Sequence, residues 1–245
     1  MTEPSTTRRR PRSITSGGGR VAIFDLDRTL LPGSSLVTFG RAVRDAGVVS
    51  STACVRHAVA AAGFNRRGLG DGRVGRIRDA LLRQAVGVEY EVVLDIVRSA
   101  APSLLDALFI EGRWLVESHL SRGDFCVVLS ASPQELVDVV RAGLGCHRSV
   151  GTRLEVEDGR LTGRLAAPFC YGPAKLERLR AELGAVELAE AAAYSDSASD
   201  LPLLRAVGEP VAVNPDRALA KFATARGWPV LRFGAPGRRS LPAAS

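Results

Sequence analysis

Two carboxylates separated by one residue, Asp25 and Asp27, follow a short apolar run at residues 21–24, and Pro32 and Gly33 then break the chain. A short continuous apolar run predicts a parallel strand that is covered on both faces. Open α/β sheets bind ligands just beyond the carboxyl ends of such strands. Two acids at that point repel each other unless a cation or a proton lies between them. Because carboxylates together with several waters usually hold Mg²⁺, the pair is a candidate metal site; solvated acids or a helix cap are the alternative.

A hydroxyl group ends a second apolar run. Ser130 follows residues 126–129, and Ala131, Ser132 and Pro133 then open a predicted helix. A hydroxyl and free backbone N–H groups at a helix N-terminus could bind a phosphate group. Ordinary capping, with Ser132 as the N-cap and Pro133 at the first helical position, is the alternative.

A lysine and a second pair of acids lie at two further element ends. Lys175 falls in the first turn of a helix predicted over residues 173–183, where a cation opposes the helix dipole. A bound anion or a neighbouring carboxylate would remove that conflict, and a surface lysine is the alternative. Asp196 and Asp200 are four residues apart across a strand-to-helix turn, so two like charges share one side and favour a cation. Capping by Asp196 is the alternative there.

Alternating strands and helices must position these groups. Apolar runs predict strands at residues 21–25, 124–130, 191–194, 211–213 and 229–233. Helical patterns predict helices over 133–142, 173–183 and 216–225, and one that begins near Ser199. Two short runs within residues 148–165, around Asp158 and Gly159, predict a hairpin. The alternation favours an α/β protein with a parallel sheet and helices on both faces.

A long helical stretch separates the first two strands. Its segments lie near residues 35–46, 51–62, 73–86 and 89–110, and no strand pattern interrupts them. We therefore expect a core over 20–34 and 122–233, with residues 35–121 inserted as an all-helical cap over the active face. Residues 1–19 are expected to form a disordered basic tail, and residues 234–245 a second tail.

The four chemical features follow one another in the order acid pair, hydroxyl, lysine, acid pair, each at or just beyond the end of a predicted strand. This ordered set resembles that of the haloacid dehalogenase superfamily. Residues 24–30 (Phe-Asp-Leu-Asp-Arg-Thr-Leu) resemble its first motif, residues 129–132 its second and residues 194–202 its fourth, and Lys175 fits the third. The helical insert is similar to the cap of the phosphoserine-phosphatase-like branch, and the resemblance spans residues 20–233.

This resemblance implies a Rossmann-like core with an inserted cap, and a phosphomonoester hydrolase that works through an aspartyl-phosphate intermediate. Asp25 would be the nucleophile, and Asp27 would act as general acid and then general base. Ser130 and Lys175 would hold the phosphoryl oxygens, next to Ala131 of the second motif.

The resemblance also implies Mg²⁺ as the cofactor. Asp25, the backbone carbonyl of Asp27, and Asp196 would hold the ion, and Asp200 would support these ligands. The expected partner is a small phosphorylated substrate, which the cap would enclose.

Two residues depart from the pattern of that branch. Phosphoserine phosphatases carry a glutamate shortly after the first motif, whereas here no acid follows Asp27 until Asp45, so phosphoserine is a doubtful substrate. Ser199 replaces an asparagine that many relatives carry, and a hydroxyl can make the same hydrogen bond. Arg28, Ser132 and the cap arginines could contact an acidic substrate, with solvated positions as the alternative; those arginines are Arg66, Arg67 and Arg73.

Two other functions fit the same residues. A phosphotransferase would pass the phosphoryl group from the aspartyl phosphate to an acceptor other than water. A non-catalytic regulatory or binding protein could be built on the same fold, but Asp27, whose loss would most simply inactivate such a site, is present.

Composition sets the broad class and the expected location. With 245 residues, 46% hydrophobic and 24% charged, the chain is long enough for one substantial domain with a smaller insert. Of the net charge of +7, +4 lies in residues 1–20, so we expect a solvated tail and no nucleic-acid partner. The sequence has no signal-peptide core, no apolar run long enough to span a bilayer, and no Cys-x-x-Cys pair, which favours the cytoplasm. The oligomeric state is left open.

Overall fold

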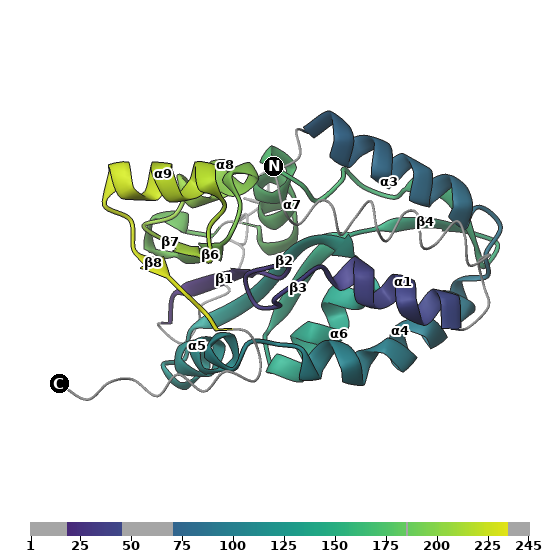
Figure 1. The fold of residues 1–245 in the computed structure, drawn as a ribbon, viewed down its shortest axis with the longest axis horizontal. Helices are drawn as coiled ribbons and strands as arrows, with labels where there is room; N and C mark the ends of the chain where they lie inside the picture. The colour runs from purple at the N-terminus through teal and green to yellow at the C-terminus, as the bar shows by residue number, and fades with distance from the viewer. Residues whose placement is uncertain (1–18, 46–70, 185, 235–245) are drawn as a thin grey trace, which may run out of the picture.

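The computed structural model describes residues 19–45, 71–184 and 186–234, whose arrangement Figure 1 shows. The helix predicted over residues 51–62, the side chains of the three cap arginines, and nearly all of both predicted tails lie outside this description. None of the helices in the described ranges is long and apolar enough to cross a membrane.

A six-stranded parallel sheet forms the centre of the molecule, in the order β3-β2-β1-β6-β7-β8. Its strands are β1 (Val21–Asp25), β2 (Phe125–Pro133), β3 (Arg148–Thr152), β6 (Ala192–Ser195), β7 (Glu209–Val213) and β8 (Val230–Leu231). Every residue of β1 is buried, as expected for a parallel strand with cover on both faces. The predicted α/β class and parallel sheet are confirmed.

Helices cover both faces of this sheet (Figure 1). One layer contains α4 (Tyr90–Asp106), α5 (Ile110–Ser121) and α6 (Gln134–Leu144), and the other contains α7 (Pro173–Leu183), α8 (Leu201–Leu204) and α9 (Arg217–Arg226). Ala22 and Phe24 of β1 pack into the first layer, and Val21 and Ile23 into the second. Successive side chains of a strand point to opposite faces, so one apolar run fills both cores.

The described part of the segment between β1 and β2 consists of helices and the turns that connect them. It contains α1 (Ser35–Asp45), α3 (Asp71–Ala85), α4 and α5. α4 packs against α1 and against α6 of the core, and Val116 of α5 belongs to the hydrophobic cluster of the sheet. α3 packs instead on β5 (Arg160–Leu165). A separate cap with boundaries at 35 and 121 stays a prediction.

The predicted hairpin is present but shorter than expected. It consists of β4 (Leu154–Glu157) and β5, joined by Asp158 at φ 50° and Gly159 at φ 75°. A two-residue hairpin turn with positive φ at both positions favours such an Asp-Gly pair. The prediction was wrong in beginning at residue 148, because residues 148–152 form β3, a nearly fully buried strand of the main sheet.

The capping prediction for α6 was also wrong. β2 continues to Pro133, which occupies the N-cap position of α6 without a side-chain capping bond. Ser132 is buried, and its hydroxyl is hydrogen-bonded to Ser35 and Asp27. The helices predicted over 173–183 and 216–225 are confirmed, with Asp216 as the N-cap of α9.

A buried chain of hydrogen bonds fastens α5 to the sheet. Nδ1 of His119 lies 2.7 Å from Oδ2 of Asp124, and Nε2 lies 2.7 Å from the hydroxyl of Tyr194. Burial lowers the pKa of His119 although Asp124 opposes this, so the ring is neutral near pH 7. A neutral ring donates from one nitrogen and accepts at the other. His119 therefore donates to Asp124 and accepts from Tyr194, whose ring stacks on Phe24 at 5.0 Å.

Removal of the Tyr194 hydroxyl is expected to destabilise the fold. Tyr194→Phe should lower the free energy of unfolding by about 1–3 kcal/mol, because Nε2 of His119 would stay buried without a partner. Urea denaturation followed by tryptophan fluorescence measures this loss. Thr224→Ala is the control, since it removes an exposed hydroxyl on α9 and should change stability by less than about 0.5 kcal/mol. Equal losses in the two variants would contradict the role given to the buried chain.

Candidate active site

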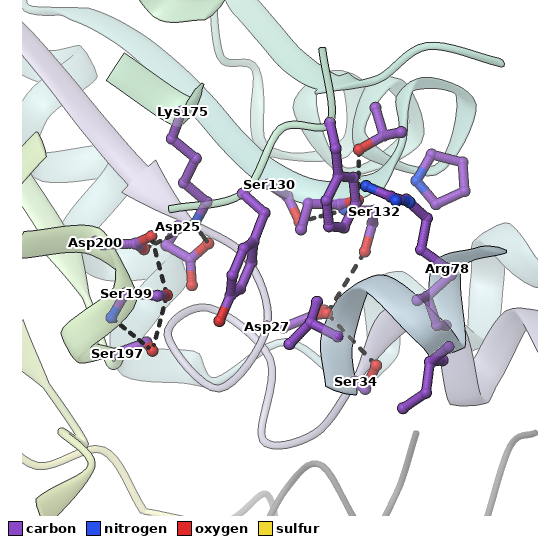
Figure 2. A pocket seen from close by; sticks show the side chains of 18 of the residues that line it. Asp25, Asp27, Ser34, Arg78, Ser130, Ser132, Lys175, Ser197, Ser199 and Asp200 are labelled. Carbon is purple, nitrogen blue, oxygen red and sulfur yellow. Dashed lines mark hydrogen bonds and ion pairs between the residues drawn. The ribbon is translucent and has the colours of Figure 1, made fainter. Parts of the chain in front are cut away.

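The carboxyl ends of β1, β2 and β6 bring the predicted chemical groups to one edge of the sheet. Asp25 pairs in register with Leu129, so Ser130 lies one residue beyond the level of Asp25 along the neighbouring strand. Phe24 pairs with Tyr194, two residues before Asp196. The strand order reverses between β1 and β6, which is the place where open α/β sheets bind ligands. Figure 2 shows the resulting pocket.

Lys175 lies at the centre of this edge, between two carboxylates. Its Nζ lies 2.6 Å from Oδ1 of Asp25 and 2.7 Å from Oδ2 of Asp200, and all three residues are buried. The hydroxyl of Thr29 donates to the other oxygen of Asp25 at 3.2 Å, and that of Ser195 donates to Asp200 at 2.6 Å. The sequence predicted that either a bound anion or a neighbouring carboxylate would compensate the cation in the first turn of α7. The structure shows neighbouring carboxylates there.

Burial and charge act against each other in this cluster. Burial raises the pKa of Asp25 to about 6; Lys175 opposes that rise, and Asp200 and Asp27 add to it. Burial alone would lower the pKa of Lys175, but Asp200 and Asp25 outweigh it and raise the pKa. Lys175 is therefore a permanent cation, while Asp25 is mostly ionised at pH 7.

Asp27 belongs to a separate group of hydrogen bonds. Its Oδ1 accepts from the backbone N–H of Ser35 at 2.8 Å, and its Oδ2 lies 3.4 Å from the Ser34 hydroxyl and 3.5 Å from that of Ser132. The hydroxyls of Ser35 and Ser132 are 2.5 Å apart. Burial raises the pKa of Asp27, and the bonds from Ser35 partly offset this. The first turn of α1 and the end of β2 thus fix the orientation of Asp27.

Ser130 and Ala131 line the pocket beside the N-terminus of α6. The Ser130 hydroxyl accepts from the backbone N–H of Ser132 at 3.1 Å, and the Thr152 hydroxyl donates to the carbonyl of Ala131 at 2.7 Å. These bonds fix the strand-to-helix connection, with the Ser130 side chain at the pocket wall.

Arg28 pairs with Asp196 across the site. Arg28 has φ 64°, a left-handed conformation that is uncommon for residues other than glycine. Its Nε lies 3.1 Å from Oδ2 of Asp196. Burial raises the pKa of Asp196 well above its ordinary value, Asp25 adds to the rise, and Arg28 opposes it. Asp25 and Asp196 therefore repel each other at this edge.

The charge balance of the site fits a divalent cation. Five carboxylates line one pocket with three cationic side chains: those of Asp25, Asp27, Asp196, Asp200 and Asp216, and those of Arg28, Arg78 and Lys175. Within the described ranges, no three His, Cys, Asp or Glu side chains form a cluster that could hold a metal by themselves. Mg²⁺ does not need such a cage, because it commonly binds through one or two carboxylates and keeps several waters. Asp25 and Asp196 are suited to this role.

All eight predicted site residues line the same pocket: Asp25, Asp27, Arg28, Ser130, Ala131, Lys175, Asp196 and Asp200. The pocket lining also includes residues that were not predicted from the sequence, among them Ser34, Arg78, Phe169, Tyr171 and Asp216. Ser34 could have been suggested by its place after the Pro-Gly break, and Phe169 and Tyr171 by the helix start that follows them. Nothing in the sequence distinguishes Arg78 from an arginine on the exposed face of a helix, so it could not have been predicted as a pocket residue.

Comparisons with known proteins agree with this geometry. The model of the family described as haloacid dehalogenase-like hydrolase matches residues 22–205. An "Inhibition of morphological differentiation protein" of Streptomyces azureus is 40% identical over 222 residues, covering 89% of this chain and 79% of its own. A protein of Mycobacterium tuberculosis named a probable phosphatase is 38% identical over 241 residues, with 96% and 82% covered. A crystal structure of a Bordetella pertussis protein of unknown function superposes with a TM-score of 0.76, at 28% identity and with 87% and 98% covered.

Replacement of Lys175 by methionine is expected to destabilise the fold in a pH-dependent way. Lys175→Met leaves Asp25 and Asp200 buried without their cation, which should cost about 3–5 kcal/mol near pH 8. Because the pKa of Asp25 is raised above its ordinary 3.8, the stability that this group contributes is present at low pH and is lost as the pH rises through about 6. Lys175 holds this pKa down against burial, so in Lys175→Met the pKa of Asp25 should rise further and the carboxyl should take up a proton near pH 5. The loss in Lys175→Met should therefore be smaller near pH 5 than near pH 8.

Urea unfolding at both pH values measures this difference. Lys221→Met, which removes an exposed lysine on α9, is the matched control and should have little effect at either pH. A loss in Lys175→Met that is independent of pH would be inconsistent with the buried carboxylates being its cause.

Proposed function

The chain belongs to the haloacid dehalogenase-like hydrolase family, and from that premise we propose that it is a Mg²⁺-dependent phosphomonoester hydrolase that acts on a small phosphorylated molecule through an aspartyl-phosphate intermediate. The observation that carries the proposal is the arrangement around Lys175. One buried ammonium group fixes Asp25 at the edge of a pocket that Asp27, Ser130 and Asp196 also line.

In the first step, an oxygen of Asp25 attacks phosphorus, and the bond from phosphorus to the leaving alcohol oxygen breaks. Lys175 and the Thr29 hydroxyl hold the two carboxylate oxygens of Asp25 and so limit the rotation of the nucleophile. With a pKa of about 6, Asp25 is mostly a carboxylate at pH 7 and can act as a nucleophile.

Asp27 supplies the proton that the leaving oxygen needs. A buried carboxyl with a raised pKa keeps a proton more readily than an exposed one, which suits a general acid. In the second step, ionised Asp27 takes a proton from water, the water oxygen bonds to phosphorus, and the bond from phosphorus to Asp25 breaks. Phosphate is released and both acids return to their starting states.

The transferred phosphoryl oxygens are held by groups at the sheet edge. The Lys175 ammonium has three N–H donors, two of which point to Asp25 and Asp200, so the third can serve an oxygen of the substrate. The Ser130 hydroxyl, the backbone of Ala131 and the side chain of Arg28 line the same pocket and complete the proposed phosphate site.

Asp25, the backbone carbonyl of Asp27, and Asp196 are proposed to hold Mg²⁺, and Asp200 supports them by fixing Lys175. When bound, the ion would screen the repulsion between the anionic nucleophile and the phosphate. Residues 35–121 are proposed to act as the cap.

Removal of the nucleophile or of Mg²⁺ is expected to abolish turnover. Wild-type protein should release phosphate from 4-nitrophenyl phosphate with Mg²⁺, and EDTA should stop the reaction. Asp25→Asn should lower kcat by about a thousandfold or more, because an amide oxygen is a poor nucleophile. Asp95→Asn makes the same change at an exposed pair with Arg98 and should keep wild-type activity. Undiminished turnover in Asp25→Asn would mean that another residue attacks phosphorus.

Loss of the Ser35 hydroxyl is expected to impair the chemical step more than binding. Ser35→Ala keeps the backbone N–H that binds Asp27 but removes the hydroxyl that contacts the Ser132 hydroxyl, which in turn lies 3.5 Å from Asp27. We expect kcat to fall about tenfold while KM changes by less than about twofold, since Asp27 would be less well oriented. Steady-state kinetics measure both constants. A change confined to KM would show that Ser35 positions the substrate and not the acid.

A further inference from the structure

The pocket continues beyond the carboxylates into a chamber with apolar walls. Four side chains of α3 line it, those of Val74, Ile77, Leu81 and Leu82, and Leu154 of β4 and Leu165 of β5 line it from the hairpin. We call this part the apolar chamber. Apart from Val74, these side chains are only half-buried, so apolar surface faces the reacting groups.

Among the described residues that line the pocket, the acids all lie at the sheet edge. Asp25, Asp27, Asp196 and Asp200 form the site already described, and Asp216 accepts from the backbone N–H groups of Ala198 and Leu219 beside them. Among the described lining residues, none on the chamber side is a carboxylate. This part of the described lining therefore offers no carboxylate for the ammonium group of a substrate such as phosphoserine.

The cation on the chamber side is already paired. Arg78 of α3 lies across the pocket from Lys175 and Asp200 (Figure 2). Its guanidinium makes an ion pair with Asp79 at 2.7 Å and lies 5.1 Å from the ring centre of Phe169. It therefore joins α3 to the loop before α7, and its charge is compensated without a substrate anion.

Main-chain hydrogen bonds join the two sides of the chamber, the end of α3 and strand β5. The N–H of Gly87, just after α3, donates to the carbonyl of Leu161 in β5 at 2.8 Å, and the N–H of Leu161 donates to the carbonyl of Val88 at 2.9 Å. At Gly163, with φ 78°, an added Cβ would lie 2.4 Å from Val86 and 3.0 Å from the carbonyl of Leu82. The hairpin and α3 are in such close contact that the chamber is formed before any substrate binds.

We propose that the apolar chamber binds the leaving group of the substrate, and that this group is a large, uncharged apolar alcohol, either an alkyl chain or an aromatic ring. The inference rests on the proposed function, because it takes the phosphate end of the pocket as given. An apolar leaving group would remove the exposed faces of Ile77, Leu81 and Leu82 from water, whereas a charged one would lose hydration without gaining a partner.

The affinity of alkyl phosphonates of increasing length tests the chamber without requiring turnover. Ethyl, butyl, hexyl and octyl phosphonate, which cannot be hydrolysed, are titrated into the full chain with Mg²⁺ by calorimetry. The Kd should fall about threefold for each added methylene until the chamber is filled. A Kd that does not change with chain length, or that rises, would overturn the inference.

A matched pair of variants on α3 locates the effect. Leu81→Gln places an amide in the chamber and should reduce the ratio of hexyl to ethyl phosphonate affinity about tenfold. Arg76→Gln introduces the same side chain at an exposed position of the same helix and should keep the wild-type ratio. Equal ratios in the two variants would place the alkyl chain elsewhere and overturn the inference.

Failure of the proposed function would give a different result. If affinity rises with chain length but no alkyl or aryl phosphate is hydrolysed, the binding of an apolar group in the chamber is supported and the hydrolase proposal is wrong. If alkyl phosphates and phosphoserine are hydrolysed with similar kcat/KM and the phosphonate series is flat, the hydrolase stands and the apolar leaving group is wrong.

Discussion

The buried ammonium group of Lys175 is the interaction on which the site depends. It contacts Asp25 at the end of β1 and Asp200 in the turn between β6 and α8, and so joins these two segments to the start of α7. Without it, two carboxylates would be buried without compensation, which proteins rarely tolerate. The same contact that makes the sheet edge stable therefore also orients the proposed nucleophile.

The parallel sheet supplies the geometry, and the segments that follow its strands supply the chemistry. The reversal of strand order between β1 and β6 leaves space between Asp25 and Asp196, where the repulsion of two carboxylates favours a cation. The start of α1 and the end of β2 fix Asp27 through Ser35 and Ser132. The proposed nucleophile and the proposed acid are thus positioned by separate hydrogen-bond networks.

Much of this could be predicted from sequence, because the site residues follow short apolar runs that end at one edge of a parallel sheet. The role of Ser132 could not: the same Ser-Pro pair suits a helix cap, and only the approach of Ser35 and Asp27 from another element distinguishes the two. β3 was merged with the hairpin because strand periodicity does not tell which sheet a strand joins. The apolar chamber was missed because it combines residues of α3 and of the hairpin, which lie far apart in the sequence.

The central claim is that Asp25 becomes covalently phosphorylated during turnover, and trapping that species tests it most directly. The full chain would be quenched in acid during steady-state hydrolysis of an aryl phosphate with Mg²⁺, then digested and sequenced by mass spectrometry. We expect a phosphoryl group on the peptide that contains residues 21–31, located at Asp25 and absent in Asp25→Asn. A phosphoryl group at another residue of a protein that is turning over would contradict the account.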